Sequence, residues 1–232
     1  MVTNREVFDA IASTWYGVRH WPLLPRELGE LVRRWRHGTL VNLGCGTGSD
    51  FTAFPESFRM VGVDFSRGML RQAQRRLTKH GVRAALTQGD LRRLPFVDRS
   101  VDYAIGIACY HHIEGDAARA EAFVELRRVL RPGGEAFLSV WNHDQPRFRG
   151  ASRDQFVPWR KGGTVLRRYY HLFTLDELQA ALLRAGFQVV RIGHGAPRGD
   201  EAENDPRNIC ALVRRPADAE SAATNSVSEE PG

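Results

Sequence analysis

The chain has 232 residues, of which 42% are hydrophobic and 26% are charged. These fractions are typical of a globular domain and exclude a collagen, a coiled coil and a wholly disordered chain. The sequence holds no run of 18 apolar residues and no apolar leader, so we expect neither a membrane span nor a signal peptide. The formal net charge is +6, and 31 of the 33 cationic residues are Arg, because Lys79 and Lys161 are the only lysines. A basic balance of this kind favours an anionic partner.

The cysteines indicate the redox setting of the chain. Cys45, Cys109 and Cys210 are odd in number, lie far apart and form no C-x-x-C pair. This spacing predicts neither a disulfide framework nor an internal metal site. Unpaired cysteines of this kind favour a cytoplasmic location.

The C-terminal segment differs in composition from the rest of the chain. Residues 216–232 carry four acids and no base, with few large apolar side chains. Such a segment cannot bury enough apolar surface to fold, so we expect a disordered acidic tail. The preceding residues 1–215 are predicted to form one domain with 33 bases and 23 acids, a net charge of +10.

The domain alternates short apolar runs with helical patterns. The runs predict strands over 39–43, 59–63, 82–86, 101–107 and 135–141, and helical spacing predicts helices over 47–55, 66–80 and 116–131. A helix over 174–185 follows, with Thr174 as its N-cap, and strands over 187–193 and 208–213 complete the pattern. Such alternation is typical of an α/β fold, with a doubly wound, mostly parallel sheet and helices on both faces.

Three polar signals follow three successive predicted strands. The loop V-N-L-G-C-G-T-G-S-D places Gly44, Gly46 and Gly48 after the first strand, where glycine permits tight turns and close approach to a ligand. Asp64 ends the second strand, where a carboxylate suits both hydroxyls of a ribose. Asp90 ends the third strand and could accept from an adenine amino group. Together, the three signals predict an adenosine ligand at the carboxyl ends of the strands.

The glycine loop resembles motif I of the class I S-adenosylmethionine (SAM)-dependent methyltransferases, as do G-D-L-R-R-L-P-F and L-R-R-V-L-R-P-G-G. Ser49 replaces the third glycine of a dinucleotide-binding loop, which disfavours a dehydrogenase. The resemblance implies SAM as cofactor and a seven-stranded Rossmann-like sheet whose last strand is antiparallel. In that family the residue at the position of Asn42 is usually acidic. The cofactor-binding residues implied are Asn42, Gly44, Cys45, Gly46, Gly48, Asp64, Phe65, Asp90, Leu91 and Ile107.

The segment after the fourth strand, I-A-C-Y-H-H-I-E-G, normally faces the transferred methyl group in the resembled family. It lacks the Asn-Pro-Pro-Tyr pattern of amino-group methylases. No Pro-Cys pair is present, so C5 methylation through a cysteine adduct is not expected. His111 and His112 are candidates for contact with the substrate, while one of them could equally be a structural histidine bonded to a backbone carbonyl.

A narrower resemblance joins three separate parts of the chain. F-D-A-I-A-S-T-W-Y-G-V-R-H-W-P, I-A-C-Y-H-H-I and R-R-Y-Y-H-L are similar to the tRNA wobble-uridine carboxymethyl methyltransferases. Tyr110 and Ile113 depart from the residues usual in that family. The resemblance implies tRNA, through its anticodon loop, and a small zinc-containing activator protein as partners. The catalytic residues implied are Arg19, His111 and His112. The substrate-binding residues implied are Trp21, Trp141, Arg160, Lys161, Arg167, Arg168, Tyr170 and His171.

The chemistry and the charge pattern agree with this reading. A carboxylate acceptor is already ionised at pH 7 and needs no general base, but it needs a positioning cation, for which Arg19 or Arg168 is the candidate. The stretch over 143–173 is too long and too basic for a plain connection. Within it, residues 146–168 hold seven bases, one acid and interleaved aromatic residues. We therefore expect RNA to lie across residues 146–171.

Two other functions fit the same motifs. In the first, the enzyme methylates a small-molecule carboxylate or hydroxyl group, and residues 143–173 form a lid. In the second, the chain is a non-catalytic SAM- or RNA-binding module, which Asn42 in place of an acid would suit. The basic excess of the 143–173 stretch favours RNA, because a lid over a metabolite does not require it.

Overall fold

The computed structural model describes residues 2–195 and 207–218, and its main feature is a seven-stranded sheet with the order β3-β2-β1-β4-β5-β9-β8. All neighbouring strands are parallel except β9, which is antiparallel to β5 and β8. The predicted α/β class and the antiparallel last strand are confirmed. The strands are β1 (Gly38–Leu43), β2 (Phe58–Asp64), β3 (Ala84–Gln88), β4 (Val101–Ile107), β5 (Leu130–Trp141), β8 (Gln188–Gly195) and β9 (Asn208–Arg214).

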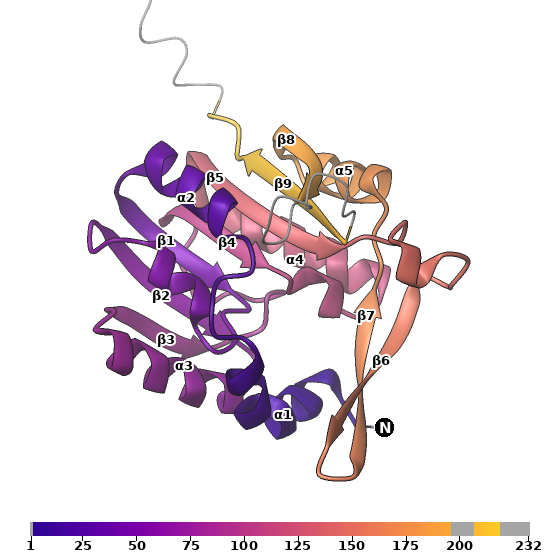
Figure 1. Cartoon of the computed structure of the whole chain (residues 1–232). Helices are drawn as coiled ribbons and strands as arrows, with labels where there is room; N and C mark the ends of the chain where they lie inside the picture. The colour runs from indigo at the N-terminus through magenta and orange to yellow at the C-terminus, as the bar shows by residue number, and fades with distance from the viewer. Residues whose placement is uncertain (1, 196–206, 219–232) are drawn as a thin grey trace, which may run out of the picture.

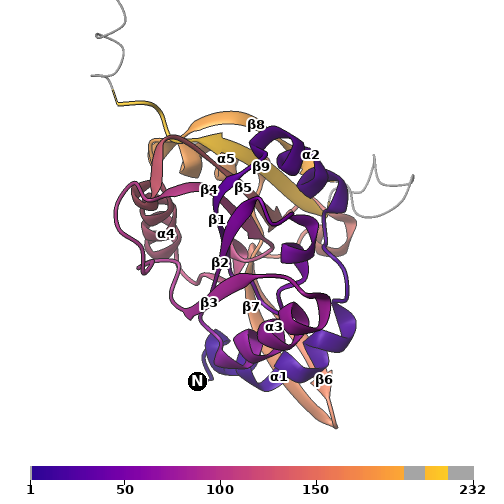
Figure 2. The same cartoon turned by 90° about the vertical axis from the view of Figure 1, so that its left-hand side faces the viewer.

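Helices cover both faces of this sheet (Figure 2). They are α1 (Asn4–Val18), α2 (Pro25–Trp35), α3 (Arg67–His80), α4 (Asp116–Val129) and α5 (Leu175–Arg184). One hydrophobic core joins α4 and α5 to the sheet, and a second core joins α2 and α3 to its other face. Helix α1 packs against α3 and lies beyond the carboxyl ends of the strands (Figure 1). None of the helices within 2–195 and 207–218 has the length and apolar character needed to cross a bilayer.

Side-chain caps explain why two of the predicted helices form where expected. Ser66 precedes α3 and its hydroxyl accepts from the Met69 amide, while Thr174 precedes α5 and accepts from the Glu177 amide. These contacts satisfy amides that have no partner within the first turn of a helix. Gly81 ends α3 in the left-handed region, and the next strand starts two residues later than predicted, at Ala84.

The helix predicted over 47–55 is wrong. The structure has only a five-residue 3-10 helix, Ser49–Ala53. Gly44, Gly46 and Gly48 all adopt positive φ angles, so the glycine loop extends into the first residues of the predicted helix and keeps them out of helical conformation. Pro55 then disfavours helical backbone at the residue before it.

The stretch over 143–173 forms an antiparallel hairpin, which the sequence reasoning did not predict. Its strands are β6 (Asp154–Lys161) and β7 (Thr164–His171), which leave Gly162 and Gly163 as a two-residue turn with positive φ at both positions. Paired positive φ angles match the right-handed twist of a tight hairpin, and glycine adopts them without strain. Figure 1 shows the hairpin projecting from the sheet beside α1.

The acidic tail predicted over 216–232 lies mostly outside the described residues. The described part, 216–218, includes Asp218, whose carboxylate pairs with Arg99 at 2.8 Å. The prediction for residues 219–232 therefore stays a prediction.

Candidate active site

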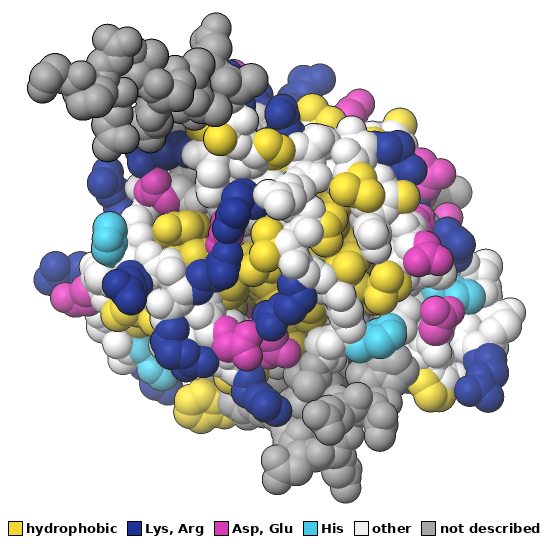
Figure 3. Space-filling view, turned by 90° about the horizontal axis from the view of Figure 1, so that it is seen from above, with side chains coloured by type: hydrophobic (Ala, Val, Ile, Leu, Met, Phe, Trp, Pro, Cys, Tyr) yellow, Lys and Arg dark blue, Asp and Glu magenta, His cyan; other side chains and the backbone are white. Residues whose placement is uncertain are grey.

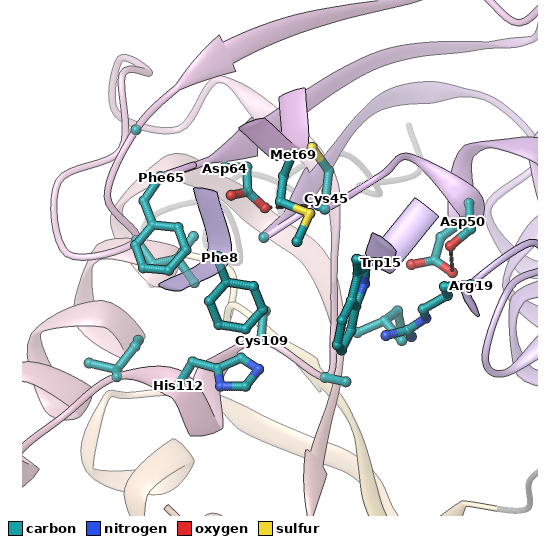
Figure 4. A pocket seen from close by; sticks show the side chains of 18 of the residues that line it. Phe8, Trp15, Arg19, Cys45, Asp50, Asp64, Phe65, Met69, Cys109 and His112 are labelled. Carbon is teal, nitrogen blue, oxygen red and sulfur yellow. Dashed lines mark hydrogen bonds between the residues drawn. The ribbon is translucent and has the colours of Figure 1, made fainter. Parts of the chain in front are cut away.

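A pocket opens at the carboxyl ends of β1, β2, β3 and β4, beneath α1 (Figure 4). Its cavity volume is about 110 Å³, and it is partly open to solvent at its mouth. Eight of the ten predicted cofactor-binding residues line it: Gly44, Cys45, Gly46, Asp64, Phe65, Asp90, Leu91 and Ile107. Asn42 and Gly48 are not in the lining. The side-chain amide of Asn42 is buried with no hydrogen-bond partner, and Gly48 packs on Ala73 of α3.

Asp64 holds the glycine loop in place. One carboxylate oxygen accepts from the Gly46 amide and the other from the Ser66 amide, both at 2.8 Å. Burial raises the pKa of Asp64 to about 6, against the lowering effect of these two amides. A carboxylate oxygen accepts more than one hydrogen bond, so both oxygens retain capacity for ligand hydroxyls. This geometry fits the predicted ribose contact.

The pocket has an apolar end near Phe65 and Leu91. Asp90 lines this end, but its carboxylate is 45% exposed and pairs with Arg92 at 2.6 Å. Hydrogen bonds from Arg92 lower the pKa of Asp90, so its carboxyl stays ionised. The predicted adenine contact therefore involves a carboxylate that already has a cationic partner.

The opposite end of the pocket carries Arg19 and Asp50. Figure 4 shows them close together, with Trp15 between them and the end that holds Phe65 and His112. Nε and Nη2 of Arg19 are buried without a hydrogen-bond partner. Asp50 is buried, and burial raises the pKa of its carboxyl. The sequence reasoning missed Asp50, for which the only signal was an acid directly after the glycine loop.

The two adjacent histidines have different positions. His112 lines the pocket, and its Nδ1 donates to the Tyr169 carbonyl at 3.0 Å. His111 is not among the lining residues; its Nδ1 accepts from the Trp141 amide at 3.1 Å, and its ring stacks on Tyr170. Burial lowers the pKa of His112 to about 3 and that of His111 well below its usual value, so both rings are neutral at pH 7. The contacts imply opposite tautomers. In His111 the proton is on Nε2, whereas in His112 the proton is on Nδ1 and Nε2 has a free lone pair.

Arg168 lies directly behind Trp15. Its guanidinium carbon is 5.2 Å from the Trp15 ring centroid and 5.0 Å from that of Trp159, and Nη1 donates to the Tyr170 hydroxyl at 2.8 Å. The side chain is buried, and Nε has no hydrogen-bond partner. In the part of the chain that the structure describes, no carboxylate pairs with this guanidinium. Burial lowers the pKa of Arg168, as expected for a cation away from water.

The other predicted substrate residues fall into two groups. Tyr170 is buried and packs on the half-buried Trp141 at a centroid distance of 4.4 Å. His171 is buried between Asp154 and Glu177, with 2.8 Å from each ring nitrogen to a carboxylate oxygen, so its ring is fully engaged within the fold. An exposed group lies at the surface: Arg160 and Arg167 on the hairpin, and Trp21 after α1. Lys161 is the last residue of β6.

These features define an α/β protein whose small-molecule pocket lies where open parallel sheets bind nucleotide-like ligands. The pocket fits SAM on three counts: a carboxylate for a ribose, an apolar end for a purine, and an unpartnered cation beside a carboxylate for a zwitterionic amino acid. Gly46 adopts a positive φ, and the nearest protein atom that a Cβ there would meet is the Gly44 carbonyl oxygen, at 4.0 Å. The loop therefore leaves room for a ligand beside its backbone.

Comparison with known proteins agrees with this description. The family described as Methyltransferase domain matches residues 40–134. A protein of Encephalitozoon cuniculi, named only as a methyltransferase, is 33% identical over 188 residues, which cover 76% of this chain and 81% of that protein. The tRNA (carboxymethyluridine(34)-5-O)-methyltransferase of Schizosaccharomyces pombe is 26% identical over 217 residues, which cover 82% of this chain and 90% of that protein.

Solved structures show the same fold. A SAM-dependent methyltransferase from Methanosarcina mazei has a TM-score of 0.70 at 17% identity, covering 81% of this chain and 98% of that one. A Haloferax volcanii complex of the Trm112 methyltransferase activator with a methyltransferase has a TM-score of 0.62 at 19% identity, covering 93% of this chain and 99% of the matched one. The chain belongs to the class I SAM-dependent methyltransferases, and SAM is its cofactor.

Proposed function

We propose that this methyltransferase esterifies the carboxymethyl group of 5-carboxymethyluridine at the wobble position of a tRNA. The single observation that carries the proposal is Arg168, a buried guanidinium without an acidic partner, directly behind Trp15 of the cofactor pocket. A buried cation is expensive unless an anion pairs with it, so this arrangement suits a carboxylate acceptor. The Schizosaccharomyces pombe relative, named for this reaction, supports the same substrate.

The mechanism needs alignment rather than proton transfer. SAM supplies a methyl group activated by a sulfonium, and a carboxylate with a pKa near 4 is already a nucleophile at neutral pH. Arg168 orients the acceptor carboxylate, while the aromatic rings of Trp15, Trp159 and Tyr170 exclude water around that cation. Anion and cation neutralise each other as the methyl group transfers, so a dry site favours the reaction.

The neutral histidines fit this mechanism. A general base is unnecessary, because the acceptor carboxylate is already ionised at neutral pH. His112 remains neutral because of its burial, and its position in the pocket wall allows it to fix the acceptor by contact. His111 holds two aromatic residues in place: its Nδ1 accepts from the Trp141 backbone amide, and its ring stacks on Tyr170.

The exposed side of the hairpin is the proposed RNA surface. Arg160 and Arg167 are exposed, and Phe156 is 55% exposed beside them. Arginines can contact phosphates, and an exposed aromatic ring can stack on an unpaired base. The face seen in Figure 3, away from the hairpin tip, differs because basic and acidic side chains are interspersed there.

We also propose that a small zinc-containing activator protein assists this chain. The Haloferax volcanii methyltransferase of the same fold occurs in a complex with the Trm112 activator, which supports this partner. Co-purification of the activator with the tagged full chain would be the expected result. Recovery of the chain alone from cells that express both proteins, with full activity, would contradict it.

A methylation assay tests the proposed reaction. The full chain, with and without the activator, receives carboxymethylated tRNA and SAM with a labelled methyl group. We expect label in an alkali-labile ester on the wobble nucleoside, and no label on tRNA that lacks the carboxymethyl group. Transfer to small carboxylic acids but not to this tRNA would support the metabolite enzyme instead. SAM binding without transfer to either acceptor, with the activator present, would support a non-catalytic module.

A further inference from the structure

A second buried arginine, Arg76 of α3, contacts the segment that carries Arg19. Arg76 is 2% exposed. Its Nη1 donates to the His20 carbonyl at 2.5 Å and its Nη2 to the Arg19 carbonyl at 2.7 Å. Its guanidinium also lies 4.7 Å from the ring centroid of Tyr16 in the last turn of α1. One side chain therefore holds the end of α1 at three points.

These contacts satisfy two backbone carbonyls where α1 ends, that of its C-cap residue Arg19 and that of His20, which follows the helix. The last carbonyls of a helix have no partner within it, and a basic side chain in the last turn often supplies one. The last turn of α1 contains no basic residue. Arg76, from a different helix, donates to the two carbonyls that follow this turn and fixes the backbone of Arg19 and His20 against α3.

The fixed backbone directs the Arg19 side chain into the pocket. Arg19 lines the pocket next to Asp50, whereas Arg76 is not among the lining residues. Nε and Nη2 of Arg19 are buried and unpartnered, so they have capacity for an anionic ligand group. The cofactor offers such a group in the carboxylate of its amino-acid end, and Asp50 offers the matching acceptor for its ammonium.

We propose that Arg76 is a positioning residue that aims Arg19 at the carboxylate of the cofactor's amino-acid end. Arg76 does not touch the cofactor; it acts through the two backbone carbonyls. This assigns Arg19 to the cofactor and leaves Arg168 for the acceptor. The inference needs only the SAM cofactor, so it stands or falls separately from the proposed tRNA substrate.

Two nucleoside probes separate this role from a general structural one. S-adenosylhomocysteine carries the amino-acid end, and 5′-methylthioadenosine shares the adenosine and the sulfur but lacks that end. Calorimetry on the full chain measures both affinities for the wild type, Arg76→Met and Arg19→Met. We expect each variant to bind S-adenosylhomocysteine about tenfold more weakly, as for a lost charge-assisted hydrogen bond, with unchanged affinity for 5′-methylthioadenosine.

The double variant and a neighbouring arginine provide the controls. If Arg76 acts through Arg19, Arg76→Met adds no further loss of S-adenosylhomocysteine affinity in the Arg19→Met background. Arg75→Met removes an exposed arginine one position earlier on α3 and should leave both affinities unchanged. Should Arg76→Met not fold, Arg76→Lys is the alternative, because it replaces two donor nitrogens with one. It should give an intermediate loss of affinity for S-adenosylhomocysteine and no loss for 5′-methylthioadenosine. Equal weakening of both probes, or of neither, would overturn the proposal.

Discussion

His112 and Tyr169 are joined by a hydrogen bond from His112 Nδ1 to the Tyr169 carbonyl, 3.0 Å long, which connects the wall of the pocket to the hairpin. The same carbonyl accepts from the side-chain amide of Asn4 at 3.2 Å. That amide also donates to the His112 carbonyl and accepts from the Tyr169 amide, both at 3.1 Å. One asparagine at the start of α1 therefore connects the pocket wall, the hairpin and the helix that covers the pocket.

Asn4→Ala should loosen this junction. It removes three hydrogen bonds between partly buried groups, and unsatisfied groups of this kind cost about 1–3 kcal/mol each before water enters. We expect lower thermal stability and a higher KM for the acceptor, because β7 carries Arg168 next to Tyr169. Thr3→Ala, which removes only the helix cap at the neighbouring position, is the control and should lower stability without the effect on KM. An unchanged KM in Asn4→Ala would show that the junction does not position the acceptor site.

The neutral histidines predict the pH dependence of the chemical step. With the pKa of His112 at about 3 and that of His111 well below its usual value, neither ring changes charge between pH 6 and 8. At saturating SAM and acceptor, kcat should therefore be flat across this range. His112→Asn should lower kcat without introducing a new inflection. A wild-type inflection near pH 6.5 that disappears in this variant would assign His112 to proton transfer and contradict the proposed mechanism.

Cofactor affinity should depend on pH through Asp64. Its carboxyl has a pKa of about 6 in the fold, above the ordinary value of 3.8, because burial disfavours its charged form. The folded chain therefore holds a proton that the unfolded chain loses between about pH 4 and 6. The stability from this proton is present at low pH and is lost as the pH rises through 6. Ribose hydroxyls bind best to the ionised form, so S-adenosylhomocysteine affinity should rise from pH 5 to 7.

Two variants test whether Asp64 causes this pH dependence. Asp64→Asn should weaken binding and make it independent of pH over this range. Asp90→Asn should keep the wild-type slope, since Arg92 lowers the pKa of Asp90 and keeps it ionised throughout. A slope that persists in Asp64→Asn would assign the titration to another group.

The sequence predicted the sheet and most of the residues that line the pocket at its edge because local patterns determine both. The loop from Gly44 to Gly48 and the acid Asp64 follow strands, and parallel strands bring their carboxyl ends together. The burial of Arg168 and the engagement of His171 were not predictable in this way. Strand alternation alone does not show which face of β7 packs against α1, since that depends on how the hairpin docks. The same limit hid Asp50 and Arg76, whose roles arise from contacts between segments distant in the sequence.

The close approach of the glycine loop to Cys109, in the segment after β4, predicts a large effect for Gly44→Ala. A Cβ at this position would lie 2.5 Å from the Cβ of Cys109, and Gly44 has a φ of +59°. The Cys109 side chain and the strained backbone at residue 44 must both adjust, so we expect the free energy of unfolding to fall by roughly 2–4 kcal/mol. Gly81→Ala is the matched control, with a φ of +66° but nothing within 4 Å of the added Cβ. Its loss should be about 1 kcal/mol. Equal losses in chemical denaturation would show that the contact with Cys109 is relieved without cost.

Arg167 and Arg168 are neighbours on β7 with opposite surroundings, which makes them a matched pair for the RNA proposal. Arg167 is exposed, whereas Arg168 is buried behind Trp15. Arg167→Gln should raise the Kd for tRNA and reduce the slope of log Kd against log salt by about 1, with kcat unchanged. Arg168→Gln should lower kcat at saturating tRNA and leave the salt slope unchanged, because its partner would be the acceptor carboxylate rather than a phosphate.

Filter binding at several salt concentrations and single-turnover kinetics measure the two quantities separately. Uncarboxymethylated tRNA provides a further control, because its affinity should respond to Arg167→Gln but not to Arg168→Gln. If both variants change the salt slope equally, Arg168 would be acting as a phosphate contact that the hairpin exposes on binding. If neither variant changes tRNA affinity or kcat, the hairpin would be a cover for a small-molecule site, because a basic surface that contacts no RNA leaves the salt dependence of tRNA binding unaltered.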